Sequence, residues 1–307
     1  MFVDGNPALN DFLTRLSYGA AFQMRDFLGS QLAQSTRERF ASIAGVGERG
    51  AAAATLHSEG IVELGPVLDA RQVAEAVAAL MRAPVHDAHV PTATSPPQAF
   101  DALCGRVHYA SYAPAAVLAA PHLIELANSP GVLGLVESYL GCPPTLYSVN
   151  AWWSFPQARR ASYSQALHRD RDDFRFVTLF VYLTTVTAVS GPHRYVRFSH
   201  DARQLAGRLV ASGVAPDQLQ ATLDELFAGT GYQHSEQAET LLGDLVHSWV
   251  GDAGTAILAD TYGLHMGKLP QEGNRLMFWA RYGLGANDVS PITADVGNDV
   301  DLGARAQ

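Results

Sequence analysis

Apolar side chains recur along the first half of the chain with the spacing of amphipathic helices. Residues 8–34 carry apolar positions three and four apart, which predicts a helix packed outside the core, with a dimer contact as the alternative. Asp69 precedes a second such pattern and is a candidate N-cap. A third pattern opens at Pro130 and ends at Gly141, residue types that are typical of helix boundaries.

Three stretches between these patterns lack helical spacing. Residues 59–67 have the character of a short strand. Residues 41–55 are small and rich in glycine and alanine, which favours a loop or a short helix. Residues 83–100 contain four prolines, which predicts a loop. The first 142 residues are therefore expected to be mainly helical, with one short strand.

The second half of the chain changes to strand-like patterns. Residues 145–155 alternate, and the more polar of their two faces is expected to look into a wet interior. Residues 175–187 are rich in aromatic and β-branched side chains, and 255–260 and 274–282 complete the predicted strands. The face of 145–155 predicted to look inward holds Leu146, Ser148, Asn150, Trp152 and Ser154.

Helical spacing returns between residues 201 and 252, which predicts a helical insertion between two strands. Residues 285–307 are rich in glycine, aspartate and asparagine, and this tail is expected to lie loosely over the surface. No internal repeat interrupts this order, so a single large domain is the simplest arrangement.

Composition narrows the class of protein. The net charge of −9 argues against a general binder of nucleic acid or anionic membranes. The two cysteines, Cys104 and Cys142, have no metal-like spacing. No signal-peptide pattern is evident, and no apolar run approaches the ~20 residues of a membrane span. We therefore expect a cytoplasmic monomer or homodimer that acts on a small molecule.

Metal chemistry is indicated by His168 and Asp170. In an extended chain residues i and i+2 point to the same side, so this pair aims an imidazole and a carboxylate at one point. A second histidine would complete the two-His, one-carboxylate facial triad that binds Fe(II), and His265 is the candidate. Arg275 follows on the last predicted strand and is suited to hold a carboxylate by a bidentate pair.

Four blocks of sequence carry a resemblance to a known family. They are Gln165-x-x-His168-x-Asp170, Phe180-Val-Tyr-Leu-Thr-Thr-Val, Gly191-Pro-His-Arg-Tyr-Val-Arg-Phe-Ser-His200, and Gly263-Leu-His265 with Gly273-Asn-Arg275. In order and spacing they resemble the phytanoyl-CoA dioxygenase family, over about residues 145–282. The resemblance implies a mostly β protein with flanking helices, whose core is a double-stranded β-helix (a cupin-like jelly roll).

The resemblance also implies what the site binds. Its cofactors would be Fe(II), 2-oxoglutarate as co-substrate and O2, with His168, Asp170 and His265 as ligands and Arg275 on the far carboxylate of 2-oxoglutarate. Gln165 lies three residues before the first ligand, where several family members contact the co-substrate, and a turn or supporting hydrogen bond is the alternative.

Three further residues are candidates for the co-substrate pocket. Asn150 and Thr178 are placed there by resemblance, with a structural hydrogen bond as the alternative for Asn150. The family pattern Gly-Ala-Thr-Arg-x-x-Pro-Gly-Ser-His differs here, because His193 replaces the threonine and Arg197-Phe198 replaces Pro-Gly. His193 would then have to make the contact of that threonine.

The resemblance suggests a domain plan. Residues 1–142 would brace the core, 143–284 would form it, 201–252 would be a helical insertion over the mouth of the site, and 285–307 would be a tail. The candidate substrate contacts are Trp152, Tyr232, Trp249 and Trp279.

The predicted function is hydroxylation or a related C–H oxidation, namely desaturation, epoxidation, cyclisation or epimerisation, of a small metabolite in bacterial secondary metabolism. Asp170 is present where related halogenases have a small residue, which disfavours halogenation. Two alternatives stay open. One is a cupin-like Zn- or Fe-dependent hydrolase or isomerase that does not use 2-oxoglutarate, and the other is a degenerate barrel that only binds a ligand.

Overall fold

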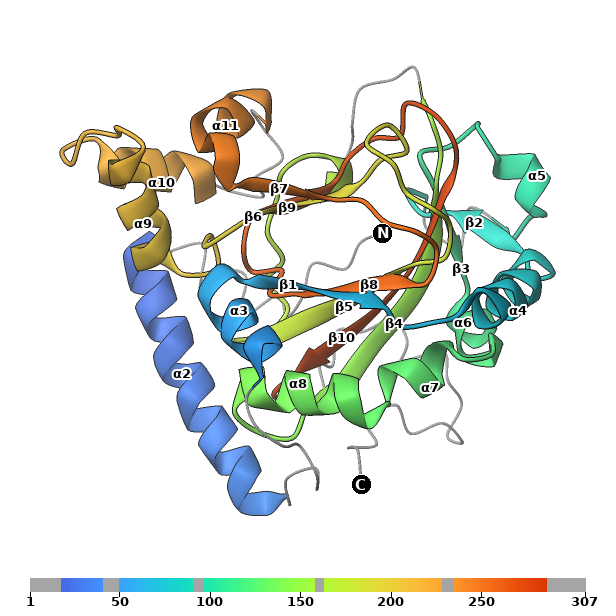
Figure 1. The fold of residues 1–307 in the computed structure, drawn as a ribbon, viewed down its shortest axis with the longest axis horizontal. Helices are drawn as coiled ribbons and strands as arrows, with labels where there is room; N and C mark the ends of the chain where they lie inside the picture. The colour runs from blue at the N-terminus through green and yellow to red at the C-terminus, as the bar shows by residue number, and fades with distance from the viewer. Residues whose placement is uncertain (1–17, 41–49, 91–95, 158–162, 228–234, 286–307) are drawn as a thin grey trace.

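Two antiparallel sheets face each other in the computed structural model, which describes residues 18–40, 50–90, 96–157, 163–227 and 235–285 (Figure 1). The larger sheet has seven strands in the order β1-β8-β5-β10-β4-β3-β2, and the smaller has three in the order β7-β6-β9. The strands are β1 Ile61–Pro66, β2 Val85–Asp87, β3 Tyr109–Tyr112, β4 Thr145–Ser154, β5 Phe176–Tyr182, β6 His193–Val196, β7 Val246–Trp249, β8 Thr255–Ala259, β9 His265–Gly267 and β10 Arg275–Gly283.

Helices cover the outer face of the larger sheet and one end of the smaller sheet (Figure 1). They are α2 Tyr18–Arg39, α3 Ala51–Glu59, α4 Ala70–Met81, α5 Phe100–Leu103, α6 Pro114–Ala119, α7 Leu123–Ala127, α8 Pro130–Leu140, α9 Ala202–Ala211, α10 Leu219–Phe227 and α11 Ser235–Leu242. Helices α3 and α8 lie beneath the larger sheet, and α9 to α11 gather beside the smaller one. None of the helices in the described ranges combines the length and the apolar character that crossing a bilayer requires.

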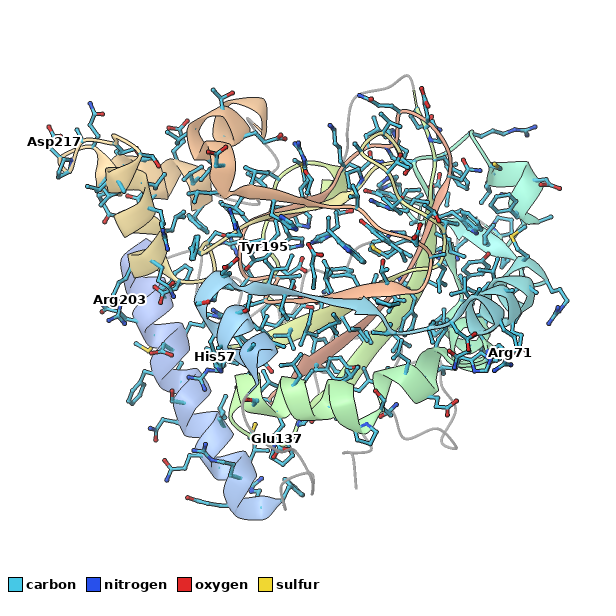
Figure 2. All side chains as sticks on the ribbon, in the orientation of Figure 1. His57, Arg71, Glu137, Tyr195, Arg203 and Asp217 are labelled. Atoms are coloured by element: carbon cyan, nitrogen blue, oxygen red, sulfur yellow. The ribbon has the colours of Figure 1, made fainter. Side chains whose placement is uncertain are left out.

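The central strands of the larger sheet are buried on both faces. On β10, Leu276 and Phe278 belong to the main core under the helices, whereas Met277 and Trp279 join an aromatic cluster between the sheets. Figure 2 shows the same division, with Tyr195 inside the molecule and Arg71, Arg203 and Asp217 at its edge. The space between the sheets is therefore lined by every second residue of β4, β5 and β10.

Several predicted helices and strands are present. Asp69 caps α4 with a capping box to Gln72, and α8 begins at Pro130 and ends before Gly141, which has a φ of 78°. Helix α2 accounts for the later part of the helix predicted over 8–34 and continues to Arg39, while residues 8–17 lie outside the described part of the chain. Of the stretch 41–55, the described end belongs to the helix α3.

Two further predictions are wrong in part, although the insertion contains the helices α9 to α11 as predicted. The proline-rich stretch contains β2, which pairs with β3, a strand that the sequence pattern did not reveal. The end of the insertion, predicted to be helical, is the strand β7 paired with β6. Both errors have one cause, because short strands owe their stability to partners distant in sequence rather than to local periodicity.

The predicted inward face of β4 is wrong at Leu146. Arg281 pairs with Ser148 but Tyr282 pairs with Leu146, so β4 holds one extra residue, Tyr147, in a bulge. The bulge reverses the faces, and Leu146 joins the core under the helices. The Tyr147 hydroxyl instead donates a hydrogen bond to Asp172 near the inner pocket.

Candidate active site

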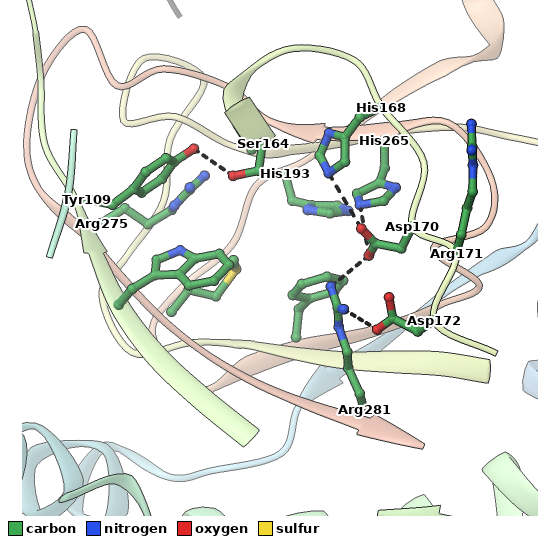
Figure 3. A pocket seen from close by; sticks show the side chains of 14 residues that line it. Tyr109, Ser164, His168, Asp170, Arg171, Asp172, His193, His265, Arg275 and Arg281 are labelled. Carbon is green, nitrogen blue, oxygen red and sulfur yellow. Dashed lines mark hydrogen bonds and ion pairs between the residues drawn. The ribbon is translucent and has the colours of Figure 1, made fainter. Parts of the chain in front are cut away.

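Three side chains with metal-binding atoms converge between the sheets: His168, Asp170 and His265 (Figure 3). Nε2 of His168 lies 3.9 Å from Oδ1 of Asp170, and Nε2 of His265 lies 3.6 Å from its Oδ2. Within the described residues this is the one group of three or more His, Cys, Asp or Glu side chains whose ligand atoms lie within 4.8 Å of one another.

Backbone hydrogen bonds fix this arrangement. His168 and His265 exchange two of them, N–H to carbonyl, at 2.9 and 2.8 Å, and the amide of Asp170 donates to the carbonyl of Thr261 at 2.8 Å. The stretch around His168 is thus an isolated bridge to β9 rather than a strand of a continuous ladder. The extended backbone still directs His168 and Asp170 toward the same point, as their spacing predicts.

Both imidazoles present the same nitrogen to the cluster. Nδ1 of His168 lies 2.8 Å from the carbonyl of Ala166, and Nδ1 of His265 lies 2.9 Å from the carbonyl of Gly263. Because a carbonyl only accepts, each Nδ1 carries a proton, which leaves Nε2 as the nitrogen that can bind a metal. Burial and the neighbouring His168 lower the pKa of His265 to about 3, which keeps this ring neutral and able to bind a metal.

These donors fit a divalent metal ion. Bonds of about 2.1 Å in octahedral geometry place neighbouring donor atoms about 3.0 Å apart. The 3.6 and 3.9 Å separations, each to a different oxygen of Asp170, exceed this spacing by less than 1 Å. Two imidazoles and one carboxylate form the donor set that suits Fe(II) with open positions.

Arg275 lies at the other end of the same pocket and is 1% exposed. Its guanidinium donates to Ser154 Oγ at 2.9 Å and to the carbonyl of Gly191, while its Nε has no hydrogen-bond partner. Burial lowers the pKa of Arg275, and the groups that oppose this shift are two tyrosines rather than a carboxylate. A buried guanidinium whose charge is not balanced by a carboxylate is suited to bind an anion from outside the protein.

Gly267 gives room to the guanidinium where β9 passes Arg275. A Cβ added at Gly267 would lie 2.9 Å from Nη2 of Arg275, so a larger residue would displace the guanidinium. The position of the guanidinium at this end of the pocket therefore depends on a residue without a side chain.

The remaining predicted co-substrate residues divide into two groups. His193 lines the pocket, with its ring 4.5 Å from that of Phe180, and its buried Nε2 has no hydrogen-bond partner. Gln165, Asn150 and Thr178 do not line the pocket, and Thr178 instead shares a hydrogen bond with Thr261.

The segment 191–200 contains a residue with left-handed backbone geometry. Phe198 stands where the family pattern has glycine and adopts a φ of 70°, a region that favours glycine. The Arg208 guanidinium lies 4.2 Å from the centre of the Phe198 ring. This contact packs the side chain of the left-handed residue against the helix α9.

The four candidate substrate contacts also lie in different places. Trp152 lines the pocket. Trp279 lies beneath the guanidinium of Arg281 at 4.7 Å, and Trp249 stacks on Tyr182 at 3.6 Å. Tyr232 lies outside the described residues.

Sequence reasoning gave no role to several residues of the pocket wall. They are Tyr109, Ser164, Arg171, Asp172, Phe180, Met277 and Arg281. Arg281 is the most consequential, because its Nη2 donates to Oδ2 of Asp170 at 2.7 Å and its Nη1 pairs with Asp172. The period of two on β10 places Arg281 on the face of Arg275, and that was the available signal.

Arg281 also sets the charge of the carboxylates. Burial opposes ionisation of Asp170, but the guanidinium of Arg281 acts together with the nearby His265 and His168, and the three hold the pKa of Asp170 below its ordinary value. Burial together with the charge of Asp170 raises the pKa of Asp172, despite the same guanidinium.

No protein-family model matches the sequence, and no curated protein matches it. Among solved structures, the chain is similar to the non-heme alpha ketoglutarate dependent epimerase SnoN from nogalamycin biosynthesis. The TM-score is 0.50 at 20% identity, over 76% of this chain and 81% of that one. A second SnoN structure, in complex with Fe3+, alpha ketoglutarate and nogalamycin RO, gives 0.51 at 20% identity, over 81% and 91%.

The fold is a double-stranded β-helix. The similarity to SnoN and the two facing antiparallel sheets confirm the fold class that the sequence predicts. At this level of identity the comparison establishes the fold alone, and the chemistry has to be argued from the pocket.

Proposed function

We propose that this protein is a non-haem Fe(II)- and 2-oxoglutarate-dependent oxygenase of the phytanoyl-CoA dioxygenase type. Its substrate would be a small metabolite of natural-product biosynthesis. The observation that carries the proposal is one pocket with a buried His168–Asp170–His265 cluster and a buried Arg275 that has no carboxylate partner. A metal and a dicarboxylate together account for both features.

In this proposal His168, Asp170 and His265 hold the iron through two Nε2 atoms and a carboxylate oxygen. Arg275 holds the distal carboxylate of 2-oxoglutarate with its fork of donors. His193 Nε2, buried without a partner, donates to the co-substrate if that nitrogen carries the proton. Gln165, Asn150 and Thr178 would support this pocket from behind its wall. Iron, 2-oxoglutarate and O2 supply the oxidation of an unactivated C–H bond.

The substrate would enter along the wall formed by Tyr109, Trp152 and Ser164. Ser164 donates a hydrogen bond to the Tyr109 hydroxyl at 3.1 Å, and the Tyr109 and Trp152 rings lie 5.8 Å apart. This wall offers flat apolar surface with hydroxyl groups at its edge, which suits a compact organic molecule. SnoN was crystallised with nogalamycin RO, a small molecule, which is consistent with a metabolite substrate here.

We further propose that residues 1–307 act as one oxygenase domain in which the insertion 201–252 covers the mouth of the pocket. Trp249, at the end of this insertion, would act through Tyr182 rather than by touching the substrate. The hydrolase alternative leaves Arg275 without a role. A hydrolase that acts through a zinc-bound water does not bind 2-oxoglutarate, so it has no dicarboxylate for a buried guanidinium to hold.

The decisive experiment is anaerobic addition of Fe(II) and then 2-oxoglutarate to metal-free protein, followed by visible absorption. A weak charge-transfer band that requires both additions reports chelation of the keto acid to iron. His168→Ala should abolish the band because it removes one of the three ligands. Arg175→Met, which alters an arginine paired with Asp26 outside this pocket, should leave it unchanged.

Absence of the band in wild-type protein that demonstrably holds Fe(II) would refute the oxygenase. A band that persists in His168→Ala would refute the ligand assignment. Once the band is established, candidate metabolites are ranked by how strongly each stimulates succinate formation.

A further inference from the structure

The carboxylate of Asp170 is held by a second carboxylate through an arginine. Arg281 lies between Asp170 and Asp172, with Nη2 donating to Oδ2 of Asp170 at 2.7 Å and Nη1 paired with Oδ2 of Asp172 (Figure 3). The Tyr147 hydroxyl donates to the same oxygen of Asp172 at 2.9 Å. The bridge thus joins β10, the bulge of β4 and the chain segment that carries the metal ligand.

This bridge is buried and has little freedom to move. Asp172 is 6% exposed, and the guanidinium of Arg281 lies 4.7 Å from the centre of the Trp279 ring. A guanidinium is planar, so its two donors reach the two carboxylates in a fixed geometry. Position and direction of the Asp170 carboxylate are therefore set from outside the metal cluster.

The charges within the bridge also cancel. A lone arginine beside a divalent cation would repel it, but Asp172 neutralises Arg281. The arginine can therefore orient Asp170 without adding net positive charge near the ion. Arg281 could donate its hydrogen bond to Asp170 without Asp172. The presence of the Asp172 carboxylate therefore indicates that Arg281 acts next to a cation.

We propose that Arg281, fixed by Asp172, is a positioning residue that occupies Oδ2 of Asp170 and leaves Oδ1 as the metal-binding oxygen. Single-oxygen binding keeps the carboxylate at one coordination position, so three positions stay open beside the two histidines. This inference rests on the proposed metal site and adds how its geometry is enforced. Outer groups that orient a ligand typically change metal affinity 10–100-fold when they are removed.

The informative change removes the bridge without changing net charge. In the double variant Arg281→Met with Asp172→Asn, one positive and one negative charge disappear together, so a change in metal affinity reports lost orientation rather than altered charge. Arg281→Lys keeps the charge, but an ammonium group cannot span both carboxylates. Arg175→Met is the matched control, because Arg175 forms a partly exposed pair with Asp26 away from the pocket.

The measurements use the metal alone. Dissociation constants for Fe(II) and Co(II) come from competition with a chelator, and the visible spectrum of bound Co(II) reports the number of ligands. We expect the double variant to bind both ions 10–100-fold more weakly, with a changed Co(II) spectrum. Arg281→Lys should show the same spectral change with a smaller loss of affinity, and the control should match wild type.

Wild-type affinity and an unchanged Co(II) spectrum in a folded double variant would overturn the proposal. If that variant does not fold, an unchanged spectrum and affinity in Arg281→Lys would overturn it equally. Because these readouts need no 2-oxoglutarate, the result is separate from that of the oxygenase test. A wild-type protein that binds the metals but gives no charge-transfer band would remove the oxygenase and leave the positioning role intact.

Discussion

Replacing Arg275 tests the co-substrate pocket most directly. In Arg275→Met the side chain keeps its length but loses every donor, whereas Arg275→Lys keeps one charge without the bidentate fork. The residue is 1% exposed, so water cannot substitute for the lost guanidinium. We therefore expect the loss to appear in the dissociation constant of 2-oxoglutarate rather than in that of the metal.

The size of the effect follows from the contact. Removing one partner of a buried, hydrogen-bonded charge pair costs about 2–5 kcal/mol. Taking about 3–4 kcal/mol for Arg275→Met gives a loss in 2-oxoglutarate affinity of about 10²–10³-fold. Arg275→Lys should lose about tenfold, because one charge-assisted hydrogen bond of about 1.5 kcal/mol is forfeited. Both variants also lose donors to Ser154 and Gly191, so thermal unfolding has to show first that they are folded.

The assay is titration of the charge-transfer band with two keto acids. The first is 2-oxoglutarate, and the second is 2-oxopentanoate, which has the same chain but lacks the distal carboxylate. If Arg275 contacts that carboxylate, 2-oxopentanoate should bind wild type and Arg275→Met with nearly equal, weak affinity. The reasoning is refuted if the substitution weakens both keto acids by the same factor, or weakens neither.

Three further predictions concern stability. Arg25→Met removes the guanidinium that lies 3.1 Å from the buried carboxylate of Asp260, and should cost about 3–5 kcal/mol in chemical unfolding. Burial raises the pKa of Asp173 to about 6, so native protein holds a proton there that unfolded chain releases near 3.9. Wild type should then lose about 2 kcal/mol relative to Asp173→Asn as pH rises from 4 to 7. Tyr182→Phe leaves the buried amide of His193, 2.8 Å from the lost hydroxyl, without its acceptor, and should cost about 1–3 kcal/mol.

Each of these has a clear contrary outcome. An unfolding free energy of Arg25→Met within about 1 kcal/mol of wild type would mean that the buried carboxylate of Asp260 does not depend on this guanidinium. A pH-independent difference between wild type and Asp173→Asn would contradict the raised pKa. Unchanged stability of Tyr182→Phe would mean that the His193 amide finds another acceptor.

The parts of the fold that the sequence predicted are those with a strong local signal. Asp69 and Gly141 mark helix ends through local effects. The Asp69 side chain accepts a hydrogen bond from an amide three residues away, and Gly141, which has no side chain, adopts the positive φ that ends a helix. The period of two on β10 likewise orders Arg275 and Arg281 on one face without any knowledge of its neighbours. His168 and Asp170 needed only their spacing to be placed on one side.

What the sequence could not supply depends on register between distant strands. The extra residue Tyr147 in β4 can be recognised only from the pairing of β4 with β10. It turns Leu146 toward the core under the helices and brings the Tyr147 hydroxyl to Asp172. Arg281 and Asp170 meet through their side chains although they lie far apart in the chain. Strand β7 was missed for a related reason, since its four residues are ordered by β6 rather than by their own pattern.

The backbone bridge between His168 and His265 has a consequence for handling the protein. Two hydrogen bonds join these ligands, so folding and not the metal brings them together. Such a preformed site discriminates poorly among first-row ions, and intrinsic affinity places Fe(II) below cobalt, nickel and copper. The ion found after purification will then depend on which metal ions were available in the host cell and on the purification column. Catalytic assays should begin by stripping the protein and reloading it with ferrous iron under argon.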